Sequence, residues 1–272
     1  MPDAARPDIA QGALRAIRFR GGGFAPQPRR GASWLAFALV IALWQGAITL
    51  GWLNPVFLPS PWSILLAFRD LVRSGELARD LSASLSRILA GWALGTAGGL
   101  LAGLGMGLFS SVRAVGLPVL SALFPVPKIA LLPLFILWFG IGEPSKIAVI
   151  GLGVFFPTIV ATFSGVDAVP RSLVRMAQSF GMPFGAIVWK VVLPGALPGI
   201  LAGFRISVSL ALVLLIAAEM IGAQHGIGAF VLSAGNLMQT DQLMAGVATL
   251  SMLGLAVGAL LSAAERRLLR WR

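Results

Sequence analysis

The sequence predicts an all-α polytopic membrane protein with about six transmembrane helices, and three observations support this prediction. Of the 272 residues, 57% are hydrophobic and only 11% are charged, which leaves too few charges to cover a soluble domain of this size. Several apolar runs are about 20 residues long, enough for a helix to cross the roughly 30 Å hydrocarbon core of a bilayer. Arginines gather at both ends of the chain and in connections between the runs.

The composition also excludes several classes of protein. A formal net charge of +11 could indicate nucleic-acid binding, but such proteins gather Lys and Arg on a soluble face, whereas here the basic residues lie between long apolar runs. Cysteine is absent, so the chain has no disulfide, no thiolate zinc site and no cysteine nucleophile. We therefore expect membrane lipid around the protein and no nucleic-acid partner.

The first element along the chain is a polar tail. Residues 1–32 are rich in Arg, Pro and Gly and offer no periodic apolar face, which predicts a disordered basic tail in the cytoplasm. The first apolar run begins only at Trp34 and is long enough to span, so it predicts a membrane anchor rather than a cleavable secretory signal. Residues 33–272 are expected to form one transmembrane domain.

Five apolar runs predict membrane spans. They cover residues 34–53, 88–112, 147–166, 206–218 with an extension backward past Arg205, and 243–264. A sixth apolar region at residues 114–142 is interrupted by four prolines and Lys128. Because proline breaks the hydrogen bonding of a helix, this region predicts an interfacial piece followed by a short or broken span.

The arginines predict that both ends of the chain lie in the cytoplasm, because basic loops are retained on that side of the membrane. The N-terminal tail contains Arg6, Arg15, Arg18, Arg20, Arg29 and Arg30, and the C-terminal end contains Arg266, Arg267, Arg270 and Arg272. Two ends on one side require an even number of spans, which agrees with six. The segment after the first span balances basic against acidic residues, as an outer loop can.

A stripe of glycines marks the second predicted span. Glycine recurs at every fourth position, at Gly91, Gly95, Gly99, Gly103 and Gly107. This spacing allows the backbone of a neighbouring helix to approach closely along one face. Two interpretations are open: the stripe packs against another helix of the same subunit, or it lines or dimerises a pathway.

The cytoplasmic connection at residues 170–203 is too apolar for a solvated loop. Four apolar residues follow helical spacing on one face: Leu173, Met176, Ala177 and Phe180. Gly181 suits the end of that helix, and Pro183 suits the first turn of the next one. The connection would present an apolar knob that needs a groove on a partner. The alternative is an amphipathic helix that lies on the lipid interface.

The same connection contains a recognisable pattern. Arg175, Met176 and Ala177 precede Gly181, and Pro194 and Pro198 mark the entry into the next span. This pattern resembles the EAA loop of binding-protein-dependent ABC importer permeases, where a glycine and then a Pro-rich helix entry follow the E-A-A triplet. The resemblance implies that residues 165–198 couple a partner ATPase to the membrane helices. Arg175 stands where the family has Glu, so a contact of that carboxylate is not carried over.

Further motifs narrow the resemblance. They are Leu58-Pro59-Ser60-Pro61, Pro125-Val126-Pro127-Lys128, Leu132-Pro133-Leu134, Trp138 through Gly142, Ala218-Glu219 and Gly226-Ile227-Gly228. Together they are similar to the nitrate, taurine and aliphatic sulfonate branch of these permeases, over about residues 52–272. The resemblance implies a type I importer permease core at residues 33–272, in the bacterial inner membrane. Its expected cargo is a small anion, an aliphatic sulfonate or taurine, with nitrate or another small solute as the alternative.

The resemblance also implies partners. Two permease copies, here a homodimer, would enclose the pathway, two ATPase subunits would dock on the cytoplasmic loops, and an external binding protein would deliver the substrate. The chain contains no G-x-x-x-x-G-K-[ST] phosphate loop. We therefore expect no cofactor in this chain, and ATP and Mg²⁺ on the partner ATPase.

An enzymatic function finds no support in the residues. His225 is the only histidine, so neither a histidine-rich metal site nor a His-based catalytic triad can be assembled. Asp167 and Asp241 are interpreted as loop or cap residues. A stand-alone secondary carrier is the alternative from another class, and it would favour several ionisable groups inside the membrane. A scaffold without transport activity would also need a partner for the apolar loop.

Three charged residues within the spans are candidates for the pathway or its gate: Arg87, Arg205 and Glu219. Arg87 and Glu219 are expected at matching depth near the outer mouth, where an unpaired charge is costly. They could form an ion pair. In the alternative, each side chain reaches the water interface separately.

Overall fold

The computed structural model describes residues 30–269, and the regular elements within that range are all helices. The predicted tail lies outside the described residues apart from residues 30–32, which open the first helix. The predicted all-α class is confirmed. The first half of the described chain forms α1 (Arg30–Thr49), α2 (Pro61–Ser74), α3 (Glu76–Leu108), α4 (Ser110–Leu123), the 3₁₀ turn η2 (Lys128–Leu131) and α5 (Leu132–Phe139).

The second half contains three of the four segments long and apolar enough to span a membrane. Its elements are α6 (Glu143–Asp167), α7 (Arg171–Ser179), α8 (Phe184–Ile187), the π-helical turn η3 (Val188–Val192), α9 (Leu193–Gly222), α10 (Ile227–Asn236) and α11 (Thr240–Leu268). The segment α8–η3–α9 is one continuous apolar stretch, Phe184–Gly222, of 39 residues.

Four of the described helical segments are long and apolar enough to cross a membrane: α3, α6, α8–η3–α9 and α11. A fifth is present if α4 and the η2–α5 unit, which meet at 86°, are counted as one broken span. The break lies within residues 114–142, where the prolines predicted a broken span. The apolar part of α1, Trp34–Thr49, is a shorter helix. Each of the six predicted segments therefore coincides with a helix, but not every one reaches full spanning length.

The helix boundaries differ from the predicted ones for local reasons. The first helix ends at Thr49 rather than residue 53, because Gly51 adopts a left-handed backbone (φ +74°) that closes the helix. Helix α3 begins at Glu76, twelve residues before the predicted start, and its first turns carry buried polar residues, Asp80, Ser84 and Arg87. Apolar composition alone could not reveal that extension.

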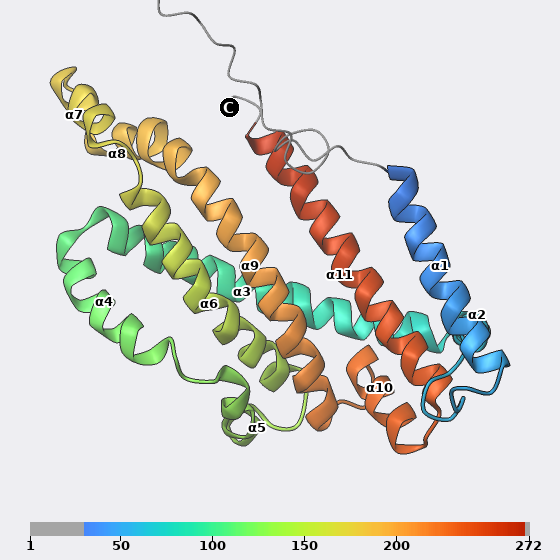
Figure 1. Ribbon diagram of the computed structural model, residues 1–272. Helices are drawn as coiled ribbons and strands as arrows, with labels where there is room; N and C mark the ends of the chain where they lie inside the picture. Colours follow the sequence, from blue (N-terminus) through green and yellow to red (C-terminus); the bar gives the residue numbers. More distant parts are fainter. Residues whose placement is uncertain (1–29, 270–272) are drawn as a thin grey trace, which may run out of the picture.

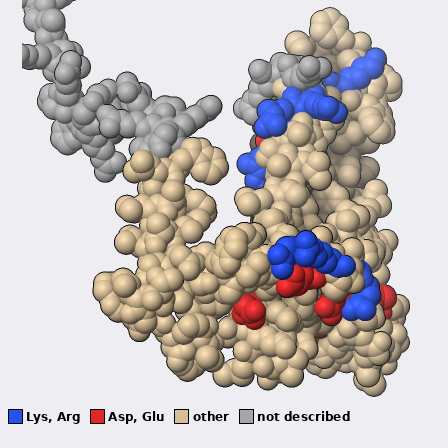
Figure 2. Space-filling model, turned by 90° about the vertical axis from the view of Figure 1, so that its right-hand side faces the viewer, with Lys and Arg blue, Asp and Glu red and all other residues tan. Residues whose placement is uncertain are grey.

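The chain runs back and forth between two ends of the molecule (Figure 1). One end carries α7 and α8, and the start of α1 and the end of α11 lie toward the same end. The opposite end carries α2, α5 and α10. We call these the α7 end and the α10 end. In Figure 2, the charged side chains toward the α7 end are mostly Lys and Arg, whereas basic and acidic side chains lie together near the α10 end. The two ends of the described chain thus lie toward the same end of the molecule, as an even number of spans requires.

Helix α6 lies at the centre of the core, between α3 and α9. The glycine stripe of α3 faces α6: a Cβ atom on Gly95 would lie 2.3 Å from the carbonyl oxygen of Gly151, and one on Gly99 would lie 2.7 Å from that of Phe155. Gly91, Gly103 and Gly107 meet α6 at similar distances. The stripe thus packs inside one subunit, as in the first of its two interpretations, and holds α3 and α6 in backbone contact.

Labelling of single cysteines tests the orientation, in a chain that has no cysteine of its own. Ser74 and Gln224 are exposed at the α10 end, and Ser179 is exposed at the α7 end. We expect Ser74→Cys and Gln224→Cys to react with an impermeant external thiol reagent in intact cells, and Ser179→Cys to react only after the membrane is opened. The reverse pattern would show that the α7 end faces outward.

Candidate functional site

Two buried side chains of opposite charge meet at the α10 end of the core. Nη1 of Arg87 on α3 donates to Oε1 of Glu219 on α9 over 2.6 Å. The arginine side chain is 3% exposed and the carboxylate is fully buried. This is the paired arrangement, and it excludes the alternative in which each side chain reaches water separately. At such burial the two charges stabilise each other only because they are in direct contact.

The other edge of the Arg87 guanidinium binds Glu143, the first residue of α6. Nη2 donates to Oε1 over 2.6 Å, and Nε donates to Oε2, so the carboxylate is held by two parallel bonds. The Glu143 side chain is 54% exposed. Nη1 also donates to the carbonyl oxygen of His225 over 2.7 Å. Arg87 therefore joins α3 to α6, α9 and the loop before α10.

Glu219 has further donors besides Arg87. The Ser84 hydroxyl donates to Oε1 over 2.8 Å, and the Gly228 amide donates to Oε2 over 2.8 Å. The start of α10 is tied down in the same way, because the Ile227 amide donates to Ser84 Oγ and the Gly226 amide donates to Asp80. Every lone pair of a buried carboxylate that is hydrogen bonded lowers the cost of its burial. We call Asp80, Ser84, Arg87, Glu143, Glu219 and Gly226 the outer cluster.

Gly226 is the one position in the outer cluster where only glycine fits. Its φ is +131°, and a Cβ atom would lie 2.5 Å from Cδ of Glu219 and 2.6 Å from Nη1 of Arg87. A side chain here would therefore push the two charged groups apart as well as strain the backbone. The loop before α10 can close over the ion pair because residue 226 has no side chain.

Several residues of the outer cluster were missed by sequence reasoning. Glu143, Ser84 and Asp80 were not predicted as partners of Arg87 and Glu219, and Lys146, 4% exposed, was also not predicted as a buried residue. A signal existed for Glu143: arginine has five donors, so a buried arginine with one carboxylate needs further acceptors. Glu143 opens a helix directly after Gly140-Ile141-Gly142, but nothing in a single sequence places that turn beside α3.

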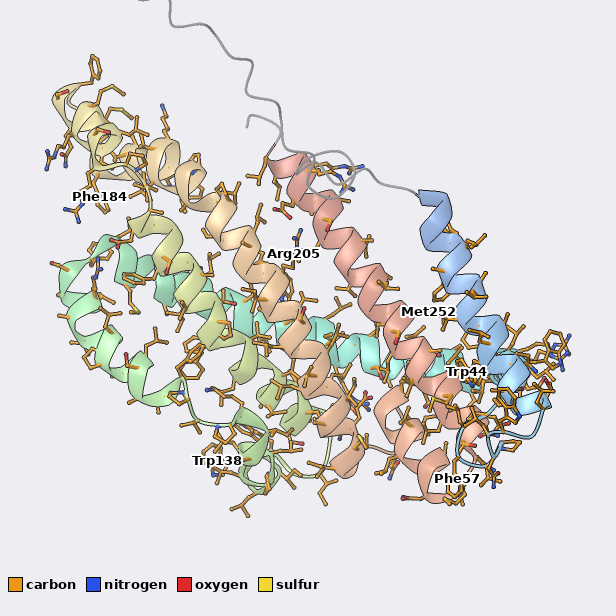
Figure 3. All side chains as sticks on the ribbon, in the orientation of Figure 1. Trp44, Phe57, Trp138, Phe184, Arg205 and Met252 are labelled. Atoms are coloured by element: carbon orange, nitrogen blue, oxygen red, sulfur yellow. The ribbon has the colours of Figure 1, made fainter. Side chains whose placement is uncertain are left out.

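Arg205, the third predicted pathway residue, does not join the outer cluster. Its Nη2 donates to Oε2 of Glu265 over 2.6 Å, and its side chain is 57% exposed. Figure 3 shows Arg205 on α9, with α11 beside it and well away from the α10 end. The structure thus separates Arg205 from Arg87 and Glu219 and pairs it with α11.

Most of the predicted coupling residues lie on α7 or directly after it, at the α7 end (Figure 3), whereas Pro194 and Pro198 lie at the start of α9. Ala177 is buried at 4% exposure and anchors α7, whereas Leu173 and Met176 are half-exposed and Phe180 is 78% exposed. Gly181 has a φ of +69°, and its amide donates to the Gln178 carbonyl, which ends α7. Arg175 lies on α7 beside Met176 and is exposed.

Beyond Gly181, α8 and η3 add apolar side chains that sequence reasoning did not single out. Phe184 is 59% exposed and Trp189 is 73% exposed. With Leu173, Met176 and Phe180 they are the large exposed apolar side chains of α7, α8, η3 and the turn between them; we call these five residues the α7 knob. The π-helical turn η3 then leads into Pro194 and Pro198 of α9. π-helical turns are rare and occur mostly as single turns within α-helices, often at functional sites.

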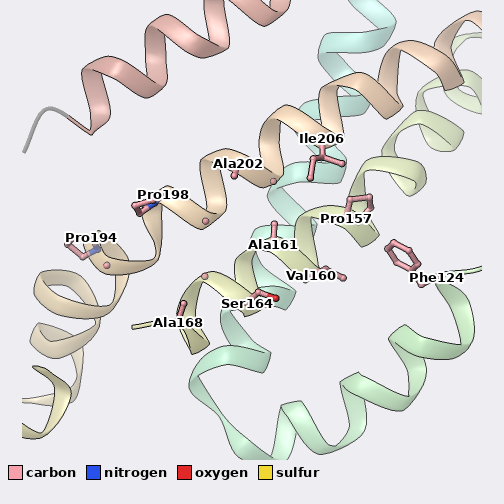
Figure 4. Close-up of a pocket in the computed structure, with 14 residues that line it drawn as sticks. Phe124, Pro157, Val160, Ala161, Ser164, Ala168, Pro194, Pro198, Ala202 and Ile206 are labelled. Carbon is pink, nitrogen blue, oxygen red and sulfur yellow. The ribbon is translucent and has the colours of Figure 1, made fainter. Parts of the chain in front are cut away.

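A groove of about 760 Å³ lies between α6 and α9 (Figure 4). Its walls are made mainly of small and apolar residues, among them Pro157, Ala161, Ser164, Pro198, Ala202 and Ile206. Phe124, at the end of α4, closes one side. None of the residues that line the groove carries a charge, so the groove can hold water and a solute without binding an ion tightly. Within residues 30–269, no group of three or more His, Asp and Glu residues could hold a metal ion.

Comparison with known proteins decides the family. Residues 95–271 match the family described as binding-protein-dependent transport system inner membrane component. The chain belongs to this family. It is a multi-pass permease subunit of an ABC importer and is not itself an enzyme. Permeases of this kind work with separate ATPase subunits.

The relatives cover most of the chain. The permease is 38% identical over 235 residues to the putative aliphatic sulfonates transport permease protein SsuC of Bacillus subtilis (strain 168), covering 86% of this chain and 85% of that one. It is 38% identical over 239 residues to the taurine transport system permease protein TauC of Escherichia coli (strain K12), covering 86% and 87%.

Solved structures show the same fold at low identity. A chain of the inward-facing MetNI methionine ABC transporter has a TM-score of 0.57 at 22% identity, covering 71% of this chain and 94% of that chain. A chain of an amino acid ABC transporter has a TM-score of 0.58 at 18% identity, covering 74% and 98%. The predicted type I importer permease core is thus confirmed.

Proposed function

We propose that this permease carries an aliphatic sulfonate or taurine inward across the bacterial inner membrane, driven by ATP hydrolysis on a separate ATPase subunit. The identity of 38% to both a sulfonate and a taurine permease supports this cargo. The motifs that narrowed the resemblance to the same branch include Ala218-Glu219 and Gly226-Ile227-Gly228. In the structure these two motifs meet in the outer cluster.

The groove between α6 and α9 is the proposed wall of the pathway. It is large enough for a small solute, at about 760 Å³, and its uncharged lining would let an anion pass without being trapped. A second copy of the chain would complete the passage by facing this groove. An external binding protein would supply the selectivity that such a weakly polar wall lacks.

The α7 knob is the proposed contact with the ATPase. Five exposed apolar side chains at the end of short helices match a helix-in-groove mode of recognition, in which each side chain fills a pocket of the partner. ATP and Mg²⁺ would bind to that partner. The alternative function of a stand-alone carrier would leave the α7 knob without a role.

Growth on defined sulfur sources tests the cargo. A host that lacks its own sulfonate and taurine importers is given this chain together with its cognate ATPase and binding protein. We expect growth on taurine or ethanesulfonate as the only sulfur source and uptake of the labelled compound, with growth on sulfate unchanged in all strains. If the complete system imported nitrate instead and no sulfonate, the proposed cargo would be wrong.

A further inference from the structure

A pocket of about 440 Å³ lies at the α7 end, separate from the groove between α6 and α9. The ends of α3 and α6, Arg113 of α4, and the helices α7, α8 and η3 line it. Three arginines from two parts of the chain line it: Arg113, Arg171 and Arg175. Its volume is within the range of about 300–1,000 Å³ that is typical of small-molecule sites.

The charges around this pocket are unbalanced. Arg113 binds Asp167, with 3.0 Å between Nη1 and Oδ1, and its guanidinium lies 4.6 Å from the centre of the Phe163 ring. Within the described part of the chain, neither Arg171 nor Arg175 forms a salt bridge. With Asp167 as the only acid among the described residues of the lining, the pocket has two positive charges in excess.

Helix α7 adds to the positive field. Arg171 and Arg175 are four residues apart and therefore lie on the same face, where like charges repel. The first turn of α7 contains no acidic residue, and no side chain caps its amides. An anion in the pocket would relieve the repulsion and would also interact favourably with the start of this helix.

Apart from Gln178, the rest of the lining is apolar. Leu108, Val166, Ile187 and Val192 line the pocket, each from a different element. Phe184 lines it as well, and its ring lies 5.9 Å from that of Phe109. A free inorganic anion would gain nothing from these walls. An anion attached to a hydrocarbon chain would use both the arginines and the apolar side chains.

We propose that this pocket binds the phosphate headgroup of an anionic phospholipid from the cytoplasmic leaflet. The pocket lies where the long helices α3 and α6 end, which is the depth of the headgroups if these helices span the bilayer. Basic pockets between transmembrane helices on the cytoplasmic side are suited to such headgroups. A free phosphate or sulfonate shares the anionic chemistry, and the experiment below separates it from lipid.

The site gives Arg175 a role that differs from that of the glutamate found there in the family. A glutamate at this position could not bind an anion in the pocket, whereas an arginine can bind it with two parallel hydrogen bonds. Because Arg175 is on α7, the lipid would hold one of the helices that carry the α7 knob. Lipid composition would then influence how this end of the permease is positioned.

Lipid retention measures the site directly. The full-length permease is purified from membranes into detergent, and native mass spectrometry counts the molecules of phosphatidylglycerol that remain bound, with phosphatidylcholine as the neutral comparison. We expect Arg113→Gln and Arg175→Gln each to lower the retained phosphatidylglycerol by about five-fold or more, because each removes a charged partner of the phosphate. Arg175→Lys should keep most of it.

Lys190→Gln is the matched control, since Lys190 is an exposed basic residue of η3 that does not line the pocket. This variant should retain phosphatidylglycerol like the unaltered chain, and circular dichroism should show the same helix content for all variants. Equal retention by all variants, or an equal loss in the Lys190 variant, would overturn the proposal. So would complete displacement of the lipid by millimolar phosphate or ethanesulfonate, which would assign the pocket to a free anion.

Discussion

Glu219→Gln is expected to destabilise the permease strongly, because it leaves Arg87 buried beside a neutral group. Removal of one partner from a buried ion pair typically costs about 3–5 kcal/mol of the free energy of unfolding. Arg87→Gln should be at least as harmful, since it also frees both oxygens of Glu143. The yield of folded protein in mild detergent and the temperature of aggregation measure this loss, and uptake should fall with it.

A double-mutant cycle separates the pair from its surroundings. If Arg87 and Glu219 stabilise each other, the variant with both substitutions loses less than the sum of the two single losses, by about 0.5–3 kcal/mol. Arg205 and Glu265 form an ion pair at the same distance of 2.6 Å, but their side chains are 57% and 31% exposed. The same cycle on that pair should give a coupling of only about 0.2–1 kcal/mol. Additive losses at both pairs would show that the buried contact has no special energetic role.

Transport should be lost when the α7 knob is altered, although the chain still enters the membrane. Phe180→Asp places a charge at the most exposed aromatic side chain of the knob, and burial of that carboxylate in an apolar groove of the ATPase would be costly. Phe180→Leu keeps the apolar character and should retain most of the activity. Uptake by whole cells and co-purification of the ATPase with the permease measure the effect.

Gly181 offers a second test of the same surface that adds no charge. Its φ of +69° disfavours any side chain by about 1–2 kcal/mol, so Gly181→Val should unwind the end of α7 and move the knob. Gly185 is a suitable control because it is helical, lies four residues further on and, like Gly181, has open space where a side chain would begin. Gly185→Val should therefore be milder. Wild-type uptake in both Phe180→Asp and Gly181→Val would contradict the docking role.

The fold could be predicted from the sequence where local residues alone determine the structure of a segment. Apolar length located the long helices, the prolines of residues 114–142 located the broken span, and Gly181 located the end of α7. The spacing of the glycines on α3 predicted a close helix contact. It did not identify α6 as the partner, because several apolar helices could have met that face.

The outer cluster was only half predictable for the same reason. Arg87 and Glu219 stand out as charges within apolar runs, and their depths could be compared along the chain. Glu143 opens α6, and Asp80 and Ser84 lie in the polar first part of α3, where polar residues are ordinary. Their role depends on the loop before α10, which returns to the core and brings Gly226 against the ion pair. Such a return is a property of the whole fold rather than of any local pattern.

The continuity of α8, η3 and α9 has a mechanical consequence. Phe184 of the α7 knob and Glu219 of the outer cluster are borne by the same helical segment, 35 residues apart, which corresponds to a lever of about 50 Å. A tilt of a few degrees at one end of such a lever displaces the other end by several ångströms, more than a hydrogen bond tolerates. A movement imposed at the α7 end would thus strain the hydrogen bonds of Glu219, unless α8–η3–α9 bends at the π-helical turn or at the prolines beside it.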